Sequence, residues 1–154
     1  MGSDREVPVR SEILQIIASG LAGCGFAMIF HIKPRYLPLI FIGAALGWFV
    51  FLGSFELWGI RSMSMITATM AVTVYSEIFA RVVKLPVSVI YTPTIVPLIP
   101  GGNLYYSMRG FVTDSHSDFI TYGEYLLEDT LGIVLGSLII LTFVSALTSK
   151  KKRK

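Results

Sequence analysis

Five long apolar stretches, separated by short polar connectors, leave this chain few possible folds. They cover residues 13–32, 36–55, 63–80, 85–106 and 130–148. A helix needs about 20 apolar residues to cross the hydrocarbon of a bilayer, and each stretch comes close to that length. The longest polar piece, residues 107–129, is a predicted loop and too short to be an independent domain. The pattern predicts an all-α polytopic membrane protein with about five transmembrane helices and no soluble catalytic domain.

The composition fits a chain whose main solvent is lipid. Of the 154 residues, 53% are hydrophobic and 15% are charged, whereas soluble domains carry about 25% charged residues. The formal net charge of +3 comes from the tail, because the last five residues are all basic and the rest holds 8 Lys and Arg against 10 Asp and Glu. A basic tail beside an apolar span is typical of a lipid-contacting anchor. We therefore expect the lipid bilayer, and no nucleic acid, as a partner.

The positions of the basic residues predict the orientation of the chain. Lys33 and Arg35 lie in the first connector, Arg81 and Lys84 lie in the third, and the basic tail follows the fifth apolar stretch. With five spans these three places share one side of the membrane, and basic residues favour the cytoplasmic side. We expect a multi-pass protein of the plasma (bacterial inner) membrane. Residues 1–12 would lie outside, residues 13–148 in the membrane, and residues 149–154 would form a cytoplasmic tail.

Small residues at helical spacing predict close helix packing. Gly43 with Gly47, and Gly132 with Gly136, form small-xxx-small patterns that let helix backbones approach each other. A further stripe of small residues on the first apolar stretch consists of Gly20, Gly23, Cys24 and Ala27. These patterns predict contacts within one subunit and leave a homo-oligomer open.

The fourth apolar stretch contains the pattern least compatible with a continuous helix. Pro93, Pro97 and Pro100 each remove a backbone donor and clash with the preceding turn. Gly101 and Gly102 then permit backbone shapes that other residues resist. A broken helix in hydrocarbon needs protein or water to satisfy its freed polar groups, and such breaks recur where transporters bind substrate. We predict that this helix is broken at residues 97–102 and lines a substrate site.

A second half-helix is expected over residues 104–111, with Asn103 as its N-cap. Its N-terminus would present free N–H groups and a partial positive charge, which suit a carboxylate. Arg109 could hold such a carboxylate bidentately. The alternative is a kinked helix with an interfacial belt of Tyr and Arg. The candidate substrate-binding residues are Thr92, Pro97, Pro100, Gly101, Gly102, Asn103, Tyr105, Tyr106 and Arg109.

The third apolar stretch carries polar residues near one helical face, at spacings close to multiples of 3.6 residues. This polar face consists of Ser62, Thr69, Thr73, Ser76 and Glu77. Glu77 is the only carboxylate well inside a predicted span, where ionisable residues usually face a cavity or a partner. Two hypotheses stay open. Glu77 either faces the transport path and couples transport to protons, or it pairs with Arg81 four residues later and is structural.

The sequence carries no motif of a membrane enzyme. No Ser/His/Asp or Cys/His arrangement, phosphate loop or zinc-spaced cluster is present. The single cysteine, Cys24, excludes an intrachain disulfide and a Cys-built metal site. His116, between Asp114 and Asp118 in the polar loop, is only a weak metal-binding pattern. We expect a protein that is not an enzyme and needs no cofactor or metal.

Several segments together match a known family. The most specific is Val-Pro-Leu-Ile-Pro-Gly-Gly at residues 96–102, within the stretch 93–106. The others are residues 25–30 followed by Pro34 and Arg35, residues 43–49, residues 76–81 and residues 84–86. They resemble the threonine/serine exporter superfamily, and most closely its small-subunit, YjjB-like branch. The resemblance runs over most of the chain from the first apolar stretch onward.

This resemblance implies the export of small hydrophilic metabolites. Members either fuse a larger half to a half like this one or pair two proteins, so it implies a larger YjjP-like subunit as partner. The implied substrates are small carboxylate-bearing metabolites, either threonine and serine or a dicarboxylate such as succinate. Two alternatives stay open: a structural or regulatory membrane subunit that binds no substrate, and a small homo-oligomeric channel. The broken fourth stretch and Glu77 favour transport over a scaffold.

Overall fold

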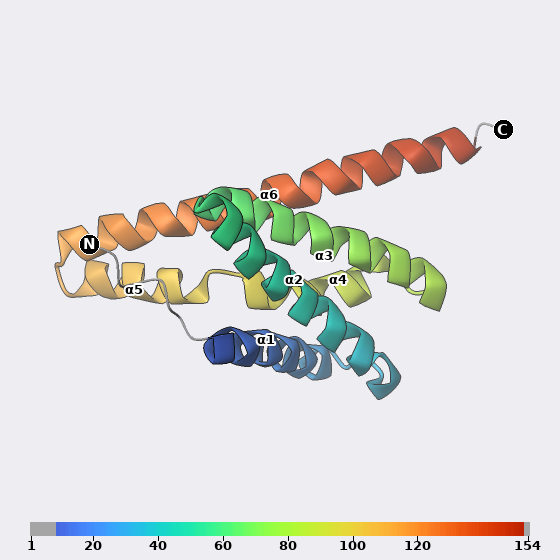
Figure 1. Cartoon of the computed structure of the whole chain (residues 1–154), viewed down its shortest axis with the longest axis horizontal. Coiled ribbons are helices and arrows are strands. Elements are labelled where there is room, and N and C mark those ends of the chain that lie inside the picture. The colour runs from blue at the N-terminus through green and yellow to red at the C-terminus, as the bar shows by residue number, and fades with distance from the viewer. Residues whose placement is uncertain (1–8, 153–154) are drawn as a thin grey trace.

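The computed structural model describes residues 9–152, and every regular element in that range is helical. In chain order the elements are α1 (Val9–Ile29), η1 (Pro34–Tyr36), α2 (Leu37–Trp58), α3 (Arg61–Val83), α4 (Val87–Ile95), η2 (Val96–Leu98), α5 (Gly101–Val112) and α6 (His116–Lys152) (Figure 1). The predicted all-α class is confirmed. The outer parts of the predicted terminal segments, residues 1–8 and 153–154, lie outside the described residues.

Within residues 9–152, four helices are long and apolar enough to cross a membrane. These spans are Ser11–Ile29, Pro34–Trp58, Arg61–Val83 and His116–Ala146. The predicted fourth crossing is present in two pieces, the shorter apolar segment Val87–Leu98 and then α5. The structure therefore agrees with about five crossings of which the fourth is broken.

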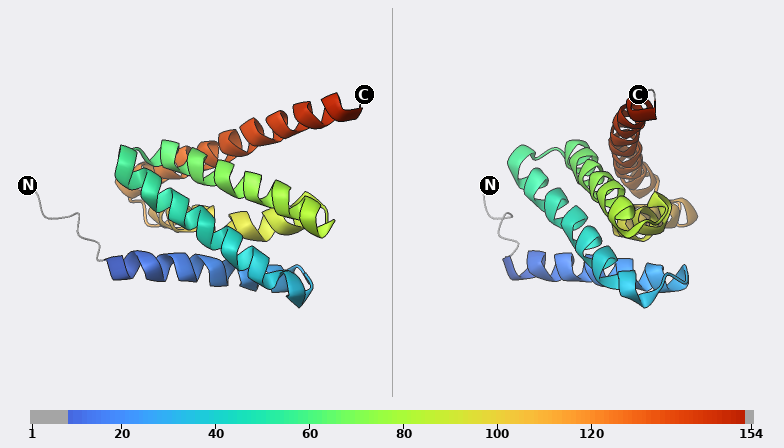
Figure 2. Two further views of the ribbon diagram at one scale, coloured as in Figure 1. Left: turned by 45° about the vertical axis from the view of Figure 1, so that its right-hand side comes forward. Right: turned by 90° about the vertical axis from the view of Figure 1, so that its right-hand side faces the viewer.

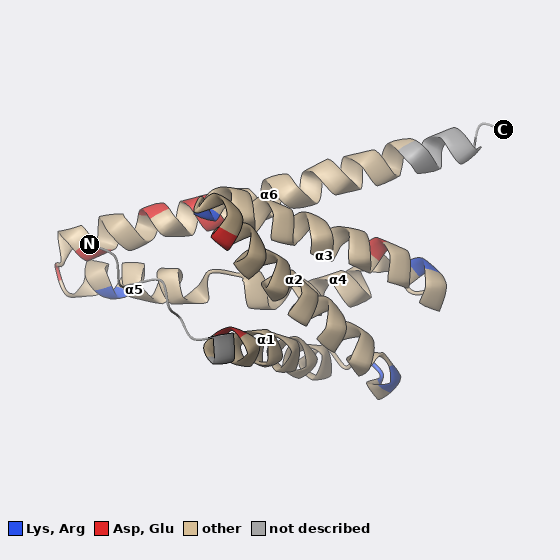
Figure 3. Cartoon of the chain, viewed as in Figure 1, with Lys and Arg blue, Asp and Glu red and all other residues tan. Residues whose placement is uncertain are grey.

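Successive crossings run in opposite directions through the bundle (Figures 1 and 2). The α1–α2 connector, the α3–α4 connector and the C-terminal end of α6 lie at one end. Lys33 and Arg35 flank the start of η1, and Arg81 and Lys84 lie at the end of α3, so we call this the basic end (Figure 3). The α2–α3 and α5–α6 connectors lie at the opposite end. The alternation that five crossings require is thus present. The side chains of residues 147–154 lie outside the described part.

The predicted polar loop over residues 107–129 is wrong. α5 continues to Val112, and α6 begins at His116 after a short turn in which Asp114 has a φ of 53°. Gly110 lets the two helices meet, because a Cβ there would lie 2.6 Å from the backbone nitrogen of Phe119. Its charged residues Asp114, Asp118, Glu124 and Glu128 are therefore exposed on a helical hairpin, whereas Ser107 and Asp129 are buried in it. With 37 residues, α6 is about 55 Å long, against about 30 Å of hydrocarbon.

The core lies where α2, α3 and η2 meet. Its buried members are Phe51, Met65, Ala68, Val72, Ile95 and Leu98. The predicted small-residue contacts are present within the chain: a Cβ at Gly47 would lie 2.6 Å from a methyl of Val72, and one at Gly136 would lie 2.6 Å from the carbonyl oxygen of Ile66. These glycines let α3 pack closely between α2 and α6. Leu98 of η2 lies beside the same glycine, 3.4 Å from a Cβ placed at Gly47.

Candidate functional site

The break in the fourth crossing begins level with the middle of α2, and its far end lies near the start of α3. α4 ends at Ile95, η2 follows, and Ile99 takes an extended conformation with a ψ of 128° before α5 begins. Leu98 is buried against Gly47 in the middle of α2. Pro97 and Pro100 flank the break, where their missing N–H groups cannot continue the helical ladder. The predicted break is confirmed, but it ends at Pro100, because Gly101 and Gly102 already belong to α5.

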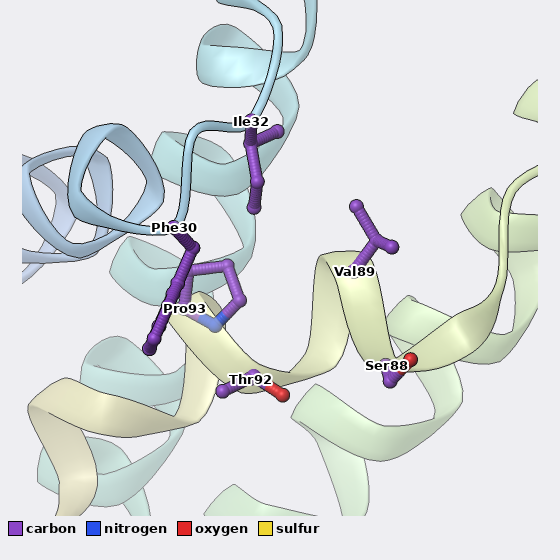
Figure 4. Close-up of a pocket in the computed structure, with 6 residues that line it drawn as sticks. All are labelled: Phe30, Ile32, Ser88, Val89, Thr92 and Pro93. Atoms are coloured by element: carbon purple, nitrogen blue, oxygen red, sulfur yellow. The ribbon is translucent and has the colours of Figure 1, made fainter.

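A pocket of about 240 Å³ opens on the α1 side of α4, nearer the basic end. It is lined by Phe30, Ile32, Ser88, Val89, Thr92 and Pro93 (Figure 4). Pro93 has no N–H to donate to the carbonyl of Val89 four residues earlier, so that acceptor is free of its helical donor. The structure therefore places Thr92 in a pocket that also holds a second hydroxyl, that of Ser88.

The hydroxyl groups of Ser88 and Thr92 differ from most others in the described helices. Thr94 in the same helix donates back to the carbonyl of Ile90 at 2.6 Å, and Ser137 donates to that of Ile133 at 2.7 Å. Among the described residues, neither Ser88 nor Thr92 has a protein hydrogen-bond partner, and both are exposed at the pocket. These two hydroxyls, one helical turn apart, are available to a polar ligand.

Gly101 and Gly102 occupy ordinary backbone conformations. Neither has a positive φ, and a Cβ at either position would meet nothing within 4 Å. The expectation that the break uses their conformational freedom is therefore wrong for this conformation. Both glycines are exposed in the first turn of α5, so what they provide is open space beside the break.

Asn103 is not the N-cap of α5. The helix begins two residues earlier with Pro100 as its N-cap, and no side chain caps it. The Asn103 amide instead donates to the Asp129 carboxylate of α6, with 2.9 Å between Nδ2 and Oδ2. The other donor to Asp129 is Arg61 at the start of α3, with Nε at 2.7 Å from Oδ1 and Nη2 at 2.9 Å from Oδ2. Three helices thus meet at one carboxylate.

Asp129 is the residue that the sequence analysis missed. Its side chain is 0% exposed, whereas that of Arg61 is 38% exposed and lies over the ring of Tyr125 at 6.0 Å. The sequence contained a signal, because Arg61 and Asp129 stand beside predicted spans on the same side of the membrane. Opposite charges at such positions can pair between helices, and ionisable residues there usually have a partner.

Tyr105, Tyr106 and Arg109 do not gather at the break. They lie along the exposed side of α5, and Arg109 is in its last turn, about 12 Å from the helix start at 1.5 Å per residue. The Tyr106 ring stacks with that of Tyr122 on α6, with 5.1 Å between centroids. These aromatic contacts belong to the α5–α6 hairpin.

The polar face of α3 is buried in the bundle. Thr69, Thr73 and Ser76 are fully buried, and Thr73 donates to the carbonyl of Thr69 at 2.7 Å. Glu77 is 8% exposed and accepts a hydrogen bond from Arg81, with 3.0 Å between Nη2 and Oε2. The ion pair required by the structural hypothesis is therefore present.

The remaining candidates stay apart from these positions. Ser62 is only partly buried near the start of α3, and His116 is exposed at the start of α6. Within residues 9–152, no group of three or more His, Cys, Asp or Glu side chains could hold a metal ion.

Comparison with known proteins gives one family match. The model of the family described as "Threonine/Serine exporter, ThrE" matches residues 15–143. That range runs from α1 through most of α6 and includes the pocket, the break and Asp129. No curated protein matches the chain. No solved structure matches it either.

Proposed function

Because the chain belongs to the threonine/serine exporter family, we propose that it is the smaller subunit of a two-component exporter. Its substrates would be small carboxylate-bearing metabolites, either threonine and serine or a dicarboxylate such as succinate. A larger YjjP-like subunit would complete the transporter. Membership of the family and the four long apolar helices already make the chain a membrane protein of an exporter family.

The observation that carries this proposal is the break itself. A crossing interrupted inside the bundle leaves backbone donors and acceptors without helical partners, and in hydrocarbon these groups need protein, water or a ligand. The first turn of α5 lacks a side-chain cap, so its N–H groups and partial positive charge favour a carboxylate nearby. Broken helices with such ends line the substrate path in other transporters.

The pocket at α4 supplies a place for substrate to dock before it reaches the break. It lies toward the basic end, which by the positive-inside argument faces the cytoplasm. Its two free hydroxyls offer hydrogen bonds to ammonium, hydroxyl or carboxylate groups of a small metabolite. A substrate would pass from this pocket along α4 to the open space at Gly101 and Gly102.

The second half of α6 supports the two-component proposal. The helix diverges from the others toward its C-terminal end (Figures 1 and 2), and its exposed apolar side chains from residue 131 onward are Leu131, Val134, Leu135, Leu138, Ile139, Leu141 and Phe143. An apolar helix face in a bilayer contacts lipid or another subunit. We assign this face to the larger subunit. Leu138→Trp should then reduce co-purification of the larger subunit, whereas Leu57→Trp on α2 should not.

Efflux measurements test the export function. Cells that make both subunits should release radiolabelled threonine, serine or succinate faster than cells that make either subunit alone. Gly101→Leu and Gly102→Leu should abolish the efflux, because the new side chains fill the open space beside the break. Gly53→Leu on α2 is the matched control, since a Cβ added at that position also meets nothing within 4 Å. Normal efflux from both α5 variants, with normal protein abundance, would favour a structural subunit instead.

A further inference from the structure

Asp129 connects the two parts of the structure that flank the break. Its carboxylate accepts a bidentate pair of hydrogen bonds from Arg61 on α3 and a third from Asn103 in the first turn of α5. Arg61 begins a helix that packs against both α2 and α6, so it belongs to the fixed part of the bundle. Asn103 follows the break directly, so it belongs to the half-helix that the break separates from α4.

The burial of Asp129 makes these bonds difficult to replace. A carboxylate that is 0% exposed has lost its water, and its ionised form then needs donors from the protein. Hydrogen bonds in which one partner is ionised are about twice as strong as neutral ones. Arg61 supplies the positive charge that balances the carboxylate. Asn103 supplies the one donor that belongs to α5. Moving α5 away would therefore leave the carboxylate short of one of its three donors.

We infer that Asp129 is a positioning residue for the fourth crossing. Its carboxylate is held in place by Arg61 of α3, and by accepting a hydrogen bond from Asn103 it docks α5 on α3 and α6. We call the hydrogen bond from Asn103 to Asp129 the tether. It attaches the half-helix to α6, and Arg61 sets the position of the carboxylate that accepts it. α5 is docked further along by Ser107, which is 5% exposed and donates to the carbonyl of Phe119 at 3.3 Å. Loss of the tether should loosen α5 from α6 without unfolding the other helices. The role rests on the proposed function only where α5 is taken as part of the transport path.

Cysteine labelling tests the tether without any transport assay. In a Cys24→Ala background, Ser107→Cys should react slowly with a water-soluble maleimide because that position is buried against α6. Adding Asn103→Leu, which keeps the size and removes the donor, should raise the labelling rate about tenfold or more, as expected for a lost bond to a charged group. Asp129→Asn should do the same. Tyr105→Cys, exposed on the same helix, should label at one rate in all backgrounds.

A double variant separates the tether from general damage. Asn103→Asp combined with Asp129→Asn keeps one carboxylate and one amide between α5 and α6, so it should restore slow labelling at position 107. Unchanged labelling in Asn103→Leu would overturn the inference, and so would a lack of rescue in the double variant at normal abundance. If Asp129→Asn fails to reach the membrane, Asn103→Leu decides alone. Efflux from the same cells reports on the proposed function separately, since labelling can change whether or not the chain exports.

Discussion

The carbonyl oxygen of Pro93 faces Gly23, where a Cβ atom would lie only 3.2 Å from it. Pro97 removes the N–H that would bond to this carbonyl in a continuous helix. The oxygen therefore lies directly against the backbone of α1. Gly23, a member of the small-residue stripe of α1, thus lets α1 pack closely against the broken crossing as well as against α2.

A methyl group at Gly23 should separate α1 from both neighbours. A Cβ there would also lie 2.9 Å from that of Ala44, and neither contact atom is the end of a flexible side chain. We expect Gly23→Ala to lower the free energy of unfolding by about 1–3 kcal/mol, the usual cost of overpacking. Thermal unfolding in detergent would measure the change.

Gly25→Ala is the matched control, because a Cβ at that position of α1 meets nothing within 4 Å. Both variants gain the same helix propensity of about 1 kcal/mol, so the difference between their unfolding midpoints isolates the contact. Equal midpoints would contradict the close approach of α1 to Pro93.

The Arg61–Asp129 pair should be costly to break from one side only. Arg61→Leu leaves a fully buried carboxylate with only the Asn103 donor. We expect a loss of about 2–4 kcal/mol in stability, somewhat less than for wholly buried pairs because the Arg61 side chain is 38% exposed. Replacing both residues, as Arg61→Leu with Asp129→Leu, should recover much of this loss. The unfolding midpoint in detergent distinguishes the variants, and a double variant less stable than Arg61→Leu would contradict the expectation.

Glu77 can be tested against its two hypotheses with one substitution. Glu77→Gln keeps the size of the side chain and removes its titration. If Glu77 couples export to protons, gradient-driven efflux should collapse while counterflow exchange of threonine survives. If Glu77 is structural through its 3.0 Å contact with Arg81, both activities should fall with protein abundance. The swap of Glu77→Arg with Arg81→Glu should then restore them. Efflux at the normal rate from Glu77→Gln would exclude the coupling role.

The orientation can be tested with single cysteines in a Cys24→Ala background. Ser115 lies in the α5–α6 turn and Ser149 near the C-terminal end of α6, so they stand at opposite ends of one helix. An impermeant maleimide added to intact cells should label Ser115→Cys and not Ser149→Cys until the cells are opened. Labelling of both positions from outside would rule out five crossings with a cytoplasmic C-terminus.

The sequence predicts the local features of this fold well. Span lengths, the break at Pro97 and Pro100, and the close approaches at Gly47 and Gly136 each depend on residues within one or two helical turns. The spacing of Glu77 and Arg81 likewise places both on one face of α3. Such features follow from helix geometry, which the sequence expresses directly.

The Asp129 site was not predicted because its partners are far apart in the chain. Arg61 and Asp129 are 68 positions apart, and Asn103 is 26 positions from Asp129. Their meeting depends on how α3, α5 and α6 cross, which periodicity within one segment does not reveal. The polar loop was mispredicted for a related reason. The charges of residues 114–128 suggested a loop surrounded by water, whereas they lie in a short turn and on the exposed face of α6, which packs on α5 through Gly110.

α6 is long enough to contact both α4 and α5, the two halves of the crossing that the prolines separate. Asp129 holds α5 through Asn103, and Ser137 holds α4 through the hydroxyl of Tyr91 at 2.7 Å. These two attachment points are about 12 Å apart on one uninterrupted helix. A tilt or rotation of α6 would therefore move α4 and α5 at the same time. α6 therefore bridges the break in the fourth crossing. A force applied to the C-terminal end of α6 would reach both sides of that break.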